Sequence, residues 1–142
     1  MTFNQLPKSI LLSLLGSFAL SLQAQVVVIV SAKNPVTKMT VDQVTQIFLG
    51  QSSTFITGGK AEPLDLADRD AARAEFCNKI LGKSPAQVKA HWSKQAFSGK
   101  GQPPASMGSA AEMVSKVAEN PKYIGYVEKS AVTGSVKVLT IQ

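Results

Sequence analysis

Apolar and polar positions along the chain change period several times, which predicts strands that alternate with helices. Residues 26–30 form a β-branched run of the kind found in strands buried on both faces. A stripe of apolar residues at helical spacing comes next: Val41, Val44, Ile47 and Phe48. Thr40 and Gln43 predict a capping box at the start of this helix, and Gly50 is expected to end it in the left-handed conformation.

The stretch 61–76 predicts a short buried strand over 63–66 that is followed at once by a helix. Asp68 is expected to cap that helix, and Phe76 and Ile80 lie four positions apart on one of its faces. The unpaired N–H groups at such a junction make it a common anion site in α/β proteins. We therefore expect the chemistry of this chain to centre here.

The rest of the chain follows the same alternation. It contains expected loops over 31–39, 51–60 and 98–106, helices from Ser84-Pro85 onward and over 109–119, and strands over 123–127 and 136–141. Strands alternating with helices predict the α/β class with a mixed sheet. The length supports one domain with a substantial core.

The N-terminal segment has the features of a secretory signal peptide. Lys8 precedes an apolar run over 10–22, and Ala24 offers a small residue at the expected cleavage point. We predict a signal peptide over 1–24, a mature domain over 25–142 and a periplasmic location. An uncleaved anchor remains the alternative, since the apolar run resumes after Gln25.

Composition narrows the chemistry further. The chain has 15 Lys and Arg against 9 Asp and Glu, a net charge of +6 that becomes +5 without Lys8, and this favours anionic ligands. Basic residues are not interleaved with aromatic ones, so nucleic acid is not an expected partner. Cys77 is the only cysteine and His91 the only histidine. We therefore expect no disulfide, metal site, cofactor or catalytic constellation, and hence no enzyme.

Four stretches resemble one known family: 39–50 (MTVDQVTQIFLG), 63–76, 81–104 (LGKSPAQVKAHWSKQAFSGKGQPP) and 120–127 (NPKYIGYV). Together and in this order they are similar to the phosphate-type substrate-binding proteins of ABC transporters. The resemblance implies a type II periplasmic-binding-protein fold with a mixed sheet flanked by helices. It also implies a phosphate-binding role beside an ABC permease.

The chain departs from the family pattern in two respects. Family members enclose phosphate between two lobes, and this chain has room for one lobe, which matches the second. The family places an Arg and a turn rich in Ser, Gly and Thr at the start of the ligand helix. Here the matching residues 68–72 keep Arg69 but have no hydroxyl groups.

Six residues form the predicted anion site: Arg69, Asp70, Ala71, Arg73, Ser31 and Lys33. Arg69 would grip the anion through its guanidinium, and the alternative is a surface Arg paired with a nearby carboxylate. Arg73 has a structural ion pair as its alternative. Ser31 and Lys33 follow the first strand, where loops often line the crevice of an open sheet, although an ordinary polar loop explains them equally well.

Two functions therefore remain open. The first is a periplasmic solute-binding module for a small oxyanion, most simply phosphate, linked to ABC-type phosphate uptake or sensing. The second is a structural or interaction module of the cell envelope that has lost its ligand. A homodimer would supply the missing wall of an open site.

Overall fold

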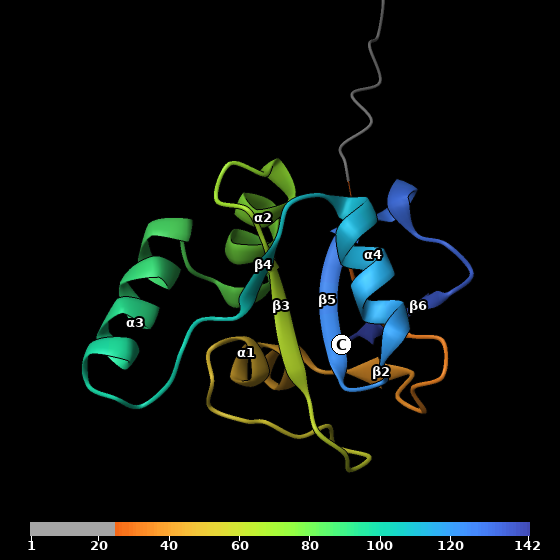
Figure 1. Ribbon diagram of the computed structural model, residues 1–142, viewed down its shortest axis with the longest axis horizontal. Helices are drawn as coiled ribbons and strands as arrows, with labels where there is room; N and C mark the ends of the chain where they lie inside the picture. Colours follow the sequence, from red (N-terminus) through yellow and green to blue (C-terminus); the bar gives the residue numbers. More distant parts are fainter. Residues whose placement is uncertain (1–24) are drawn as a thin grey trace, which may run out of the picture.

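A computed structural model describes residues 25–142, so the predicted signal peptide lies outside the described residues. The main sheet has five strands in the order β4 (Ala105–Met107), β3 (Glu62–Leu66), β5 (Tyr123–Glu128), β1 (Val26–Ser31) and β6 (Val136–Val138). β3 is parallel to both β4 and β5, whereas β1 is antiparallel to β5 and β6. This confirms the predicted mixed sheet (Figure 1).

The helices are α1 (Val41–Phe48), α2 (Ala71–Phe76), a π-helical turn η1 (Cys77–Leu81), α3 (Pro85–Phe97), α4 (Ala110–Glu119) and a 3-10 turn η2 (Lys129–Ala131). The capping box of Thr40 and Gln43 is confirmed, and Ser84 forms a second one at α3. Gly50 follows α1 with φ of 75°, as expected for a left-handed helix end. Local sequence signals therefore set these helix ends.

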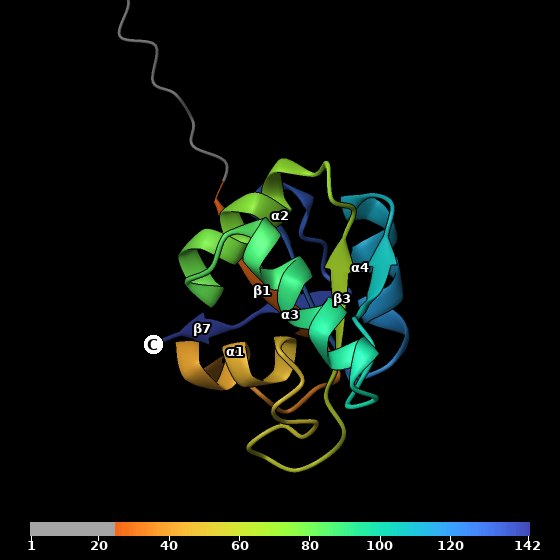
Figure 2. The same cartoon turned by 90° about the vertical axis from the view of Figure 1, so that its left-hand side faces the viewer.

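The helices cover both faces of the sheet, with α4 on one face and α1 and α2 on the other (Figure 2). The two faces of β5 show the reason for this arrangement. Tyr126 stacks on Phe76 of α2 with ring centroids 3.9 Å apart. Gly125, one residue earlier, faces α4, where a Cβ atom would lie 2.5 Å from the Sδ of Met113. Successive residues of a strand point to opposite faces, so one strand serves both layers.

A turn separates the end of β3 from α2, so the expectation that Asp68 caps this helix is wrong. The Asp70 N–H donates to the Ala67 carbonyl at 2.9 Å, and this turn delays the helix by two residues. Asp70 therefore caps α2, and its carboxylate accepts from the N–H of Ala72 at 2.9 Å. The carboxylate of Asp68 lies beside Arg73 instead.

Short strands account for the other differences from the sequence-based prediction. β2 (Lys38–Met39) and β4 lie within segments expected to be loops. The strand expected over 136–141 is divided at buried Leu139, whose N–H donates to the carbonyl of Val28. Beyond it, β7 (Thr140–Ile141) leaves the main sheet and pairs in parallel with β2.

The core of residues 25–142 draws on every layer of the fold. We therefore expect this segment to fold without residues 1–24. No helix among these residues combines the length and the apolar character that crossing a membrane requires.

Candidate functional site

A cleft of about 430 Å³ lies where β3 ends, between α3 and the proline-containing loop that leads into β4. Its lining residues are Asp65, Leu66, Asp68, Arg73, Lys89, Trp92, Ser93, Ala96, Gln102, Pro103, Pro104 and Ser106. The cleft is therefore lined by two cations, two carboxylates and two hydroxyl groups, together with the apolar rings of Trp92, Pro103 and Pro104. This is the size range of small-ligand sites in proteins.

Arg73 is the central charge of this cleft. Its Nε lies 3.2 Å from Oδ2 of Asp65, and its Nη1 lies 3.7 Å from Oδ1 of Asp68. Only 7% of the Arg73 side chain is exposed, compared with 75% of the Asp68 side chain. Burial is the largest single effect on the pKa of Arg73 and lowers it, but attraction by the Asp65 carboxylate and the hydrogen bond to it, together with smaller contributions from Cys77 and Tyr126, raise the pKa overall. Arg73 is thus a fixed cation with one buried partner and one exposed partner.

The phenol of Tyr126 holds the Asp65 carboxylate in position. The Tyr126 hydroxyl donates to Oδ1 of Asp65, while the N–H of Leu66 donates to the same Oδ1 at 2.9 Å and to the Tyr126 oxygen at 3.2 Å. Burial and the nearby Asp65 carboxylate raise the pKa of Tyr126. The phenol is therefore a neutral donor that orients the carboxylate toward Arg73. Such a network holds the guanidinium in one position on the cleft wall.

The predicted residues at the start of α2 lie together, but their donors are partly occupied. Asp70 accepts the N–H of Ala72 with its carboxylate and the N–H of Arg73 with its carbonyl, at 3.0 Å. Arg69 and Ala71 are exposed, and the Arg69 side chain forms no ion pair within residues 25–142. Of the predicted group, Arg73 alone lines the cleft.

Ser31 and Lys33 lie at the opposite end of the sheet, contrary to the expectation that they share a crevice with Arg69. β1 runs antiparallel to β5, and Val30 pairs with Ile124, which is also the partner of Pro63 at the beginning of β3. The end of β1 therefore meets the start of β3. Ser31 is buried and its Oγ accepts from the N–H of Lys33 at 3.2 Å, as in an ordinary polar loop.

Lys89, Ser93 and Gln102 are polar residues of the cleft that the sequence-based prediction missed, whereas Ser106 could be proposed from the sequence as a hydroxyl donor to an oxyanion, because it lies near the start of the fourth helix. Lys89 comes from α3 and Ser106 from β4, 16 and 33 residues after Arg73 in the chain. Both lie in or next to the stretch 81–104 that carried the most distinctive family resemblance. That resemblance was the available signal, but the side chains could be placed only once β4 was known to pair with β3.

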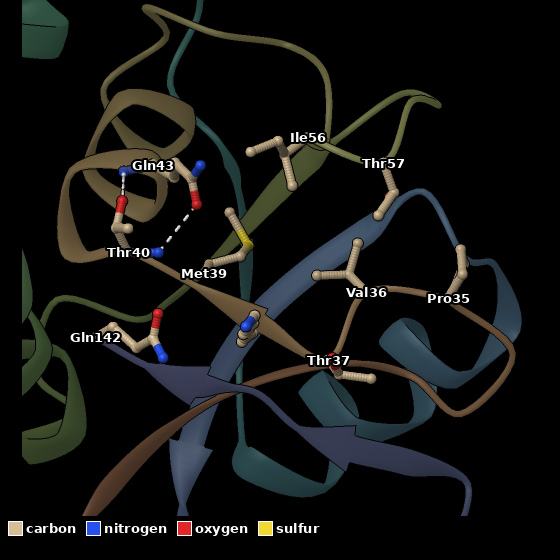
Figure 3. Close-up of a pocket in the computed structure, with 10 residues that line it drawn as sticks. Pro35, Val36, Thr37, Met39, Thr40, Gln43, Ile56, Thr57 and Gln142 are labelled. Atoms are coloured by element: carbon tan, nitrogen blue, oxygen red, sulfur yellow. Dashed lines mark hydrogen bonds between the residues drawn. The ribbon is translucent and has the colours of Figure 1, made fainter.

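A second cleft of about 310 Å³ lies between residues 35–40, α1 and the loop that contains Ile56 (Figure 3). Thr40 and Gln43 are paired with each other: the N–H of Thr40 donates to Oε1 of Gln43, and the N–H of Gln43 donates to Oγ1 of Thr40. Lys38 is the one cation among the lining residues of this cleft, compared with Arg73 and Lys89 in the first cleft. Figure 3 shows Met39, Val36 and Ile56 on the remaining walls. We therefore regard the cleft beside Arg73 as the better candidate for a charged ligand.

The fold has clear counterparts among solved structures. An ABC-type phosphate transport receptor from Vibrio cholerae superimposes with a TM-score of 0.63 at 20% identity, over 82% of this chain and 45% of the receptor. A Clostridium perfringens protein with bound phosphate, described as a phosphate ABC transporter substrate-binding protein, gives 0.65 at 19% identity, over 82% and 44%. PstS from Borrelia burgdorferi gives 0.61 at 14% identity, over 82% and 47%.

These similarities establish the fold. The chain has the architecture of one lobe of a periplasmic binding protein, and it spans a little under half the length of the proteins it matches. No family model matches the sequence, and a comparison with curated proteins gives no match. The predicted single lobe with a mixed sheet and flanking helices is confirmed.

Proposed function

We propose that this chain is a periplasmic solute-binding module for a small oxyanion, with phosphate as its first candidate, and that it serves ABC-type phosphate uptake or sensing. The anion would lie in the cleft beside Arg73 and would be bound without covalent chemistry. Lys89 supplies a second cation and Ser106 a hydroxyl donor, while Arg69 adds positive charge outside the cleft. Charge-assisted hydrogen bonds would provide most of the affinity.

The observation that carries this proposal is a buried guanidinium held rigidly on the wall of the cleft, in a fold whose solved counterparts include phosphate-transport proteins. Asp65 occupies Nε of Arg73, and the exposed Asp68 is at the long distance of 3.7 Å from Nη1. Within the described residues Nη1 and Nη2 donate no hydrogen bond, so they are open to a ligand that reaches Arg73 in the cleft. A donor that is already oriented loses little entropy when it binds.

The carboxylates make the expected ligand more specific. Asp68 is exposed on the cleft wall and can accept a hydrogen bond from an oxyanion that still carries a proton. Hydrogen phosphate has such a proton at neutral pH, and sulfate has none. A sulfate oxygen beside the Asp68 carboxylate would therefore bring two negatively charged acceptors together without a proton between them, which is unfavourable. We expect phosphate to bind more tightly than sulfate.

The open cleft sets the scale of the affinity. One lobe leaves the ligand in contact with water on one side, and water weakens each polar contact. Two or three charge-assisted contacts under these conditions correspond to a dissociation constant on the order of 0.1–10 mM. A second copy of the chain or another protein that covered the cleft would tighten binding.

Calorimetric titration of residues 25–142 with phosphate and with sulfate tests the proposal. We expect phosphate to release or absorb heat on binding and sulfate to give a smaller signal. Lys89→Gln should weaken the affinity for phosphate at least fivefold. Lys38→Gln removes an exposed lysine on another part of the surface and is the matched control. Phosphate binding that is equal in Lys89→Gln and the wild type would rule out this cleft. Light scattering at each ligand concentration would detect closure by a second copy.

A second function is favoured by one specific observation. The Ala72 N–H is capped by Asp70, and Arg73 faces two carboxylates, so the positive charge that a free anion needs is largely balanced within the protein. This balance suits a lobe that has become an interaction module of the cell envelope. The absence of any heat with either anion at 10 mM would favour this function over anion binding.

A further inference from the structure

We infer that the outward face of α3 docks on an anionic lipid bilayer. The contact surface, which we call the α3 basic face, consists of Lys94, Phe97 and Lys100, with Ala86 and Ala90 on the same side of the helix. This inference goes beyond the proposed anion binding and does not depend on it. Its evidence comes from exposure, helix geometry and charge.

The geometry of α3 separates an inner side from an outer side. Val88 and Trp92 are the buried residues of the helix, and they lie on the side opposite Phe97 at 100° per residue. Every helical residue of the α3 basic face is exposed. In Figure 1 the helix stands at the margin of the molecule, and in Figure 2 it lies in front of the other elements. The face is therefore available to a flat surface.

Phe97 is the most unusual residue on this face. It is 97% exposed, although apolar aromatic side chains are normally buried. It lies at the last position of α3, where the chain turns at Gly99, whose φ is 72°. A lone, fully exposed ring at the tip of a helix provides a compact apolar insertion point. It does not provide a groove or a broad apolar patch for a folded partner.

The charged residues that are close to Phe97 along the chain are all of one sign, whereas the carboxylate of Asp68 lies in the cleft that Ser93 and Ala96 also line. Residues 76–111 contain five lysines and no Asp or Glu, which is the longest acid-free stretch of the described chain. Lys94 and Lys100 lie three positions before and after Phe97, and both are exposed. The nearest acidic residue of the preceding helix, Glu75, is already paired with Lys79 at 2.8 Å. Among the described residues Lys94 and Lys100 form no ion pair, so the α3 basic face keeps its positive charge beside Phe97.

This combination fits lipid better than protein. Lysine is depleted at the centre of protein–protein interfaces, whereas flexible lysines that flank an inserted aromatic ring are typical of surfaces that bind anionic membranes. The long lysine side chains can reach lipid phosphate groups while the ring enters the interfacial layer. Small residues at Ala86 and Ala90 would allow the helix to lie close to the surface. The partner is therefore expected to be a bilayer that carries net negative charge.

Co-sedimentation of residues 25–142 with vesicles tests this inference, and the segment 1–24 is omitted because its apolar run would itself partition into lipid. The probes are vesicles of phosphatidylcholine alone and of phosphatidylcholine with 30% phosphatidylglycerol. We expect binding to the anionic vesicles that is at least tenfold stronger than to neutral ones, and that is lost at about 0.5 M salt. Equal binding to both compositions would overturn the inference, as would an absence of binding to either.

Variants assign the binding to this face. Phe97→Ser should weaken it about tenfold, and Lys94→Gln/Lys100→Gln about 25-fold, since each lysine near an anionic surface contributes about a fivefold factor. Lys38→Gln/Lys129→Gln removes the same charge from exposed positions elsewhere and should change binding less than twofold. If this control weakens binding as much as Lys94→Gln/Lys100→Gln, net charge and not the α3 basic face would be responsible. Circular dichroism of each variant would show that the fold is intact.

Discussion

Replacing Asp65 by Asn is the sharpest test of the charge network in the cleft. Asn keeps the shape of the side chain and an oxygen that accepts from the Tyr126 hydroxyl, but it removes the charge that faces Arg73. Only 7% of the Arg73 side chain and 19% of the Asp65 side chain are exposed, so the guanidinium would lose its buried partner. The effect should therefore appear as a loss of folding stability.

The magnitude follows from burial. Removing one partner of a buried ion pair lowers the free energy of unfolding by about 3–5 kcal/mol, because the other charge stays buried without a counter-charge. We expect about 3 kcal/mol here, at the lower limit, because Asp68 remains 3.7 Å from Nη1 and the cleft admits water. For a domain of this size that corresponds to a decrease in Tm of roughly 10 °C.

Asp68→Asn is the matched control, since it removes a carboxylate from the same guanidinium. The Asp68 side chain is 75% exposed, and an exposed ion pair contributes less than about 1 kcal/mol. Urea unfolding of residues 25–142, followed by the fluorescence of Trp92, would give both values. The double variant Asp65→Asn/Arg73→Met removes the stranded charge and should recover at least half of the lost stability. Equal losses in Asp65→Asn and Asp68→Asn would refute the buried network.

Three further predictions concern packing and pH. Gly125→Ala should destabilise the domain by about 1–3 kcal/mol, because the new Cβ would lie 2.5 Å from Met113 Sδ, whereas Gly134→Ala meets nothing within 4 Å and should be nearly neutral in the same urea assay. Gly50→Ala should cost at least about 1 kcal/mol and alter the emission spectrum of Trp92, because its φ is 75° and the Cβ would lie 2.7 Å from the indole. An unchanged urea midpoint and spectrum would contradict that packing. The raised pKa of Tyr126 means that the folded state holds the phenolic proton more tightly than the unfolded state, so its contribution to stability is complete below about pH 10 and decreases above it. Tyr126→Phe should remove part of this alkaline decrease, and urea midpoints between pH 8 and 11 that fall equally in both proteins would show that the phenol is not responsible.

The parts of the fold that depend on local sequence could be predicted, and the structure shows why. The capping residues Thr40 and Ser84 act on N–H groups three residues away, so their effect can be read from a short window. The cap of α2 was misplaced because Asp68 and Asp70 are both good capping residues. The choice between them depends on the turn at Ala67 and on Arg73, which attracts the Asp68 carboxylate.

The candidate site depended on pairings between distant residues. Ser31 was included in the predicted site because loops at strand ends often line the crevice of an open sheet. The pattern of apolar residues does not report strand direction, and β1 runs antiparallel to β5, which is parallel to β3. Lys89 and Ser106 enter the cleft through the packing of α3 and the pairing of β4 with β3. The contact between Tyr126 and Asp65 spans 61 residues of the chain. Family resemblance supplied the architecture, whereas the charge balance around Arg73 required the three-dimensional arrangement.

An amide-resolved NMR titration of residues 25–142 with phosphate would show whether the anion binds in the cleft beside Arg73. We expect saturable shifts that are confined to the residues around the cleft, at the end of β3, the start of α2 and the beginning of β4, with a dissociation constant on the order of 0.1–10 mM. Sulfate at the same ionic strength should produce smaller shifts at the same amides. Amides that stay unchanged with phosphate at 20 mM would show that the cleft does not bind phosphate, as would shifts that centre on Ser31 and Lys33 at the other end of the sheet.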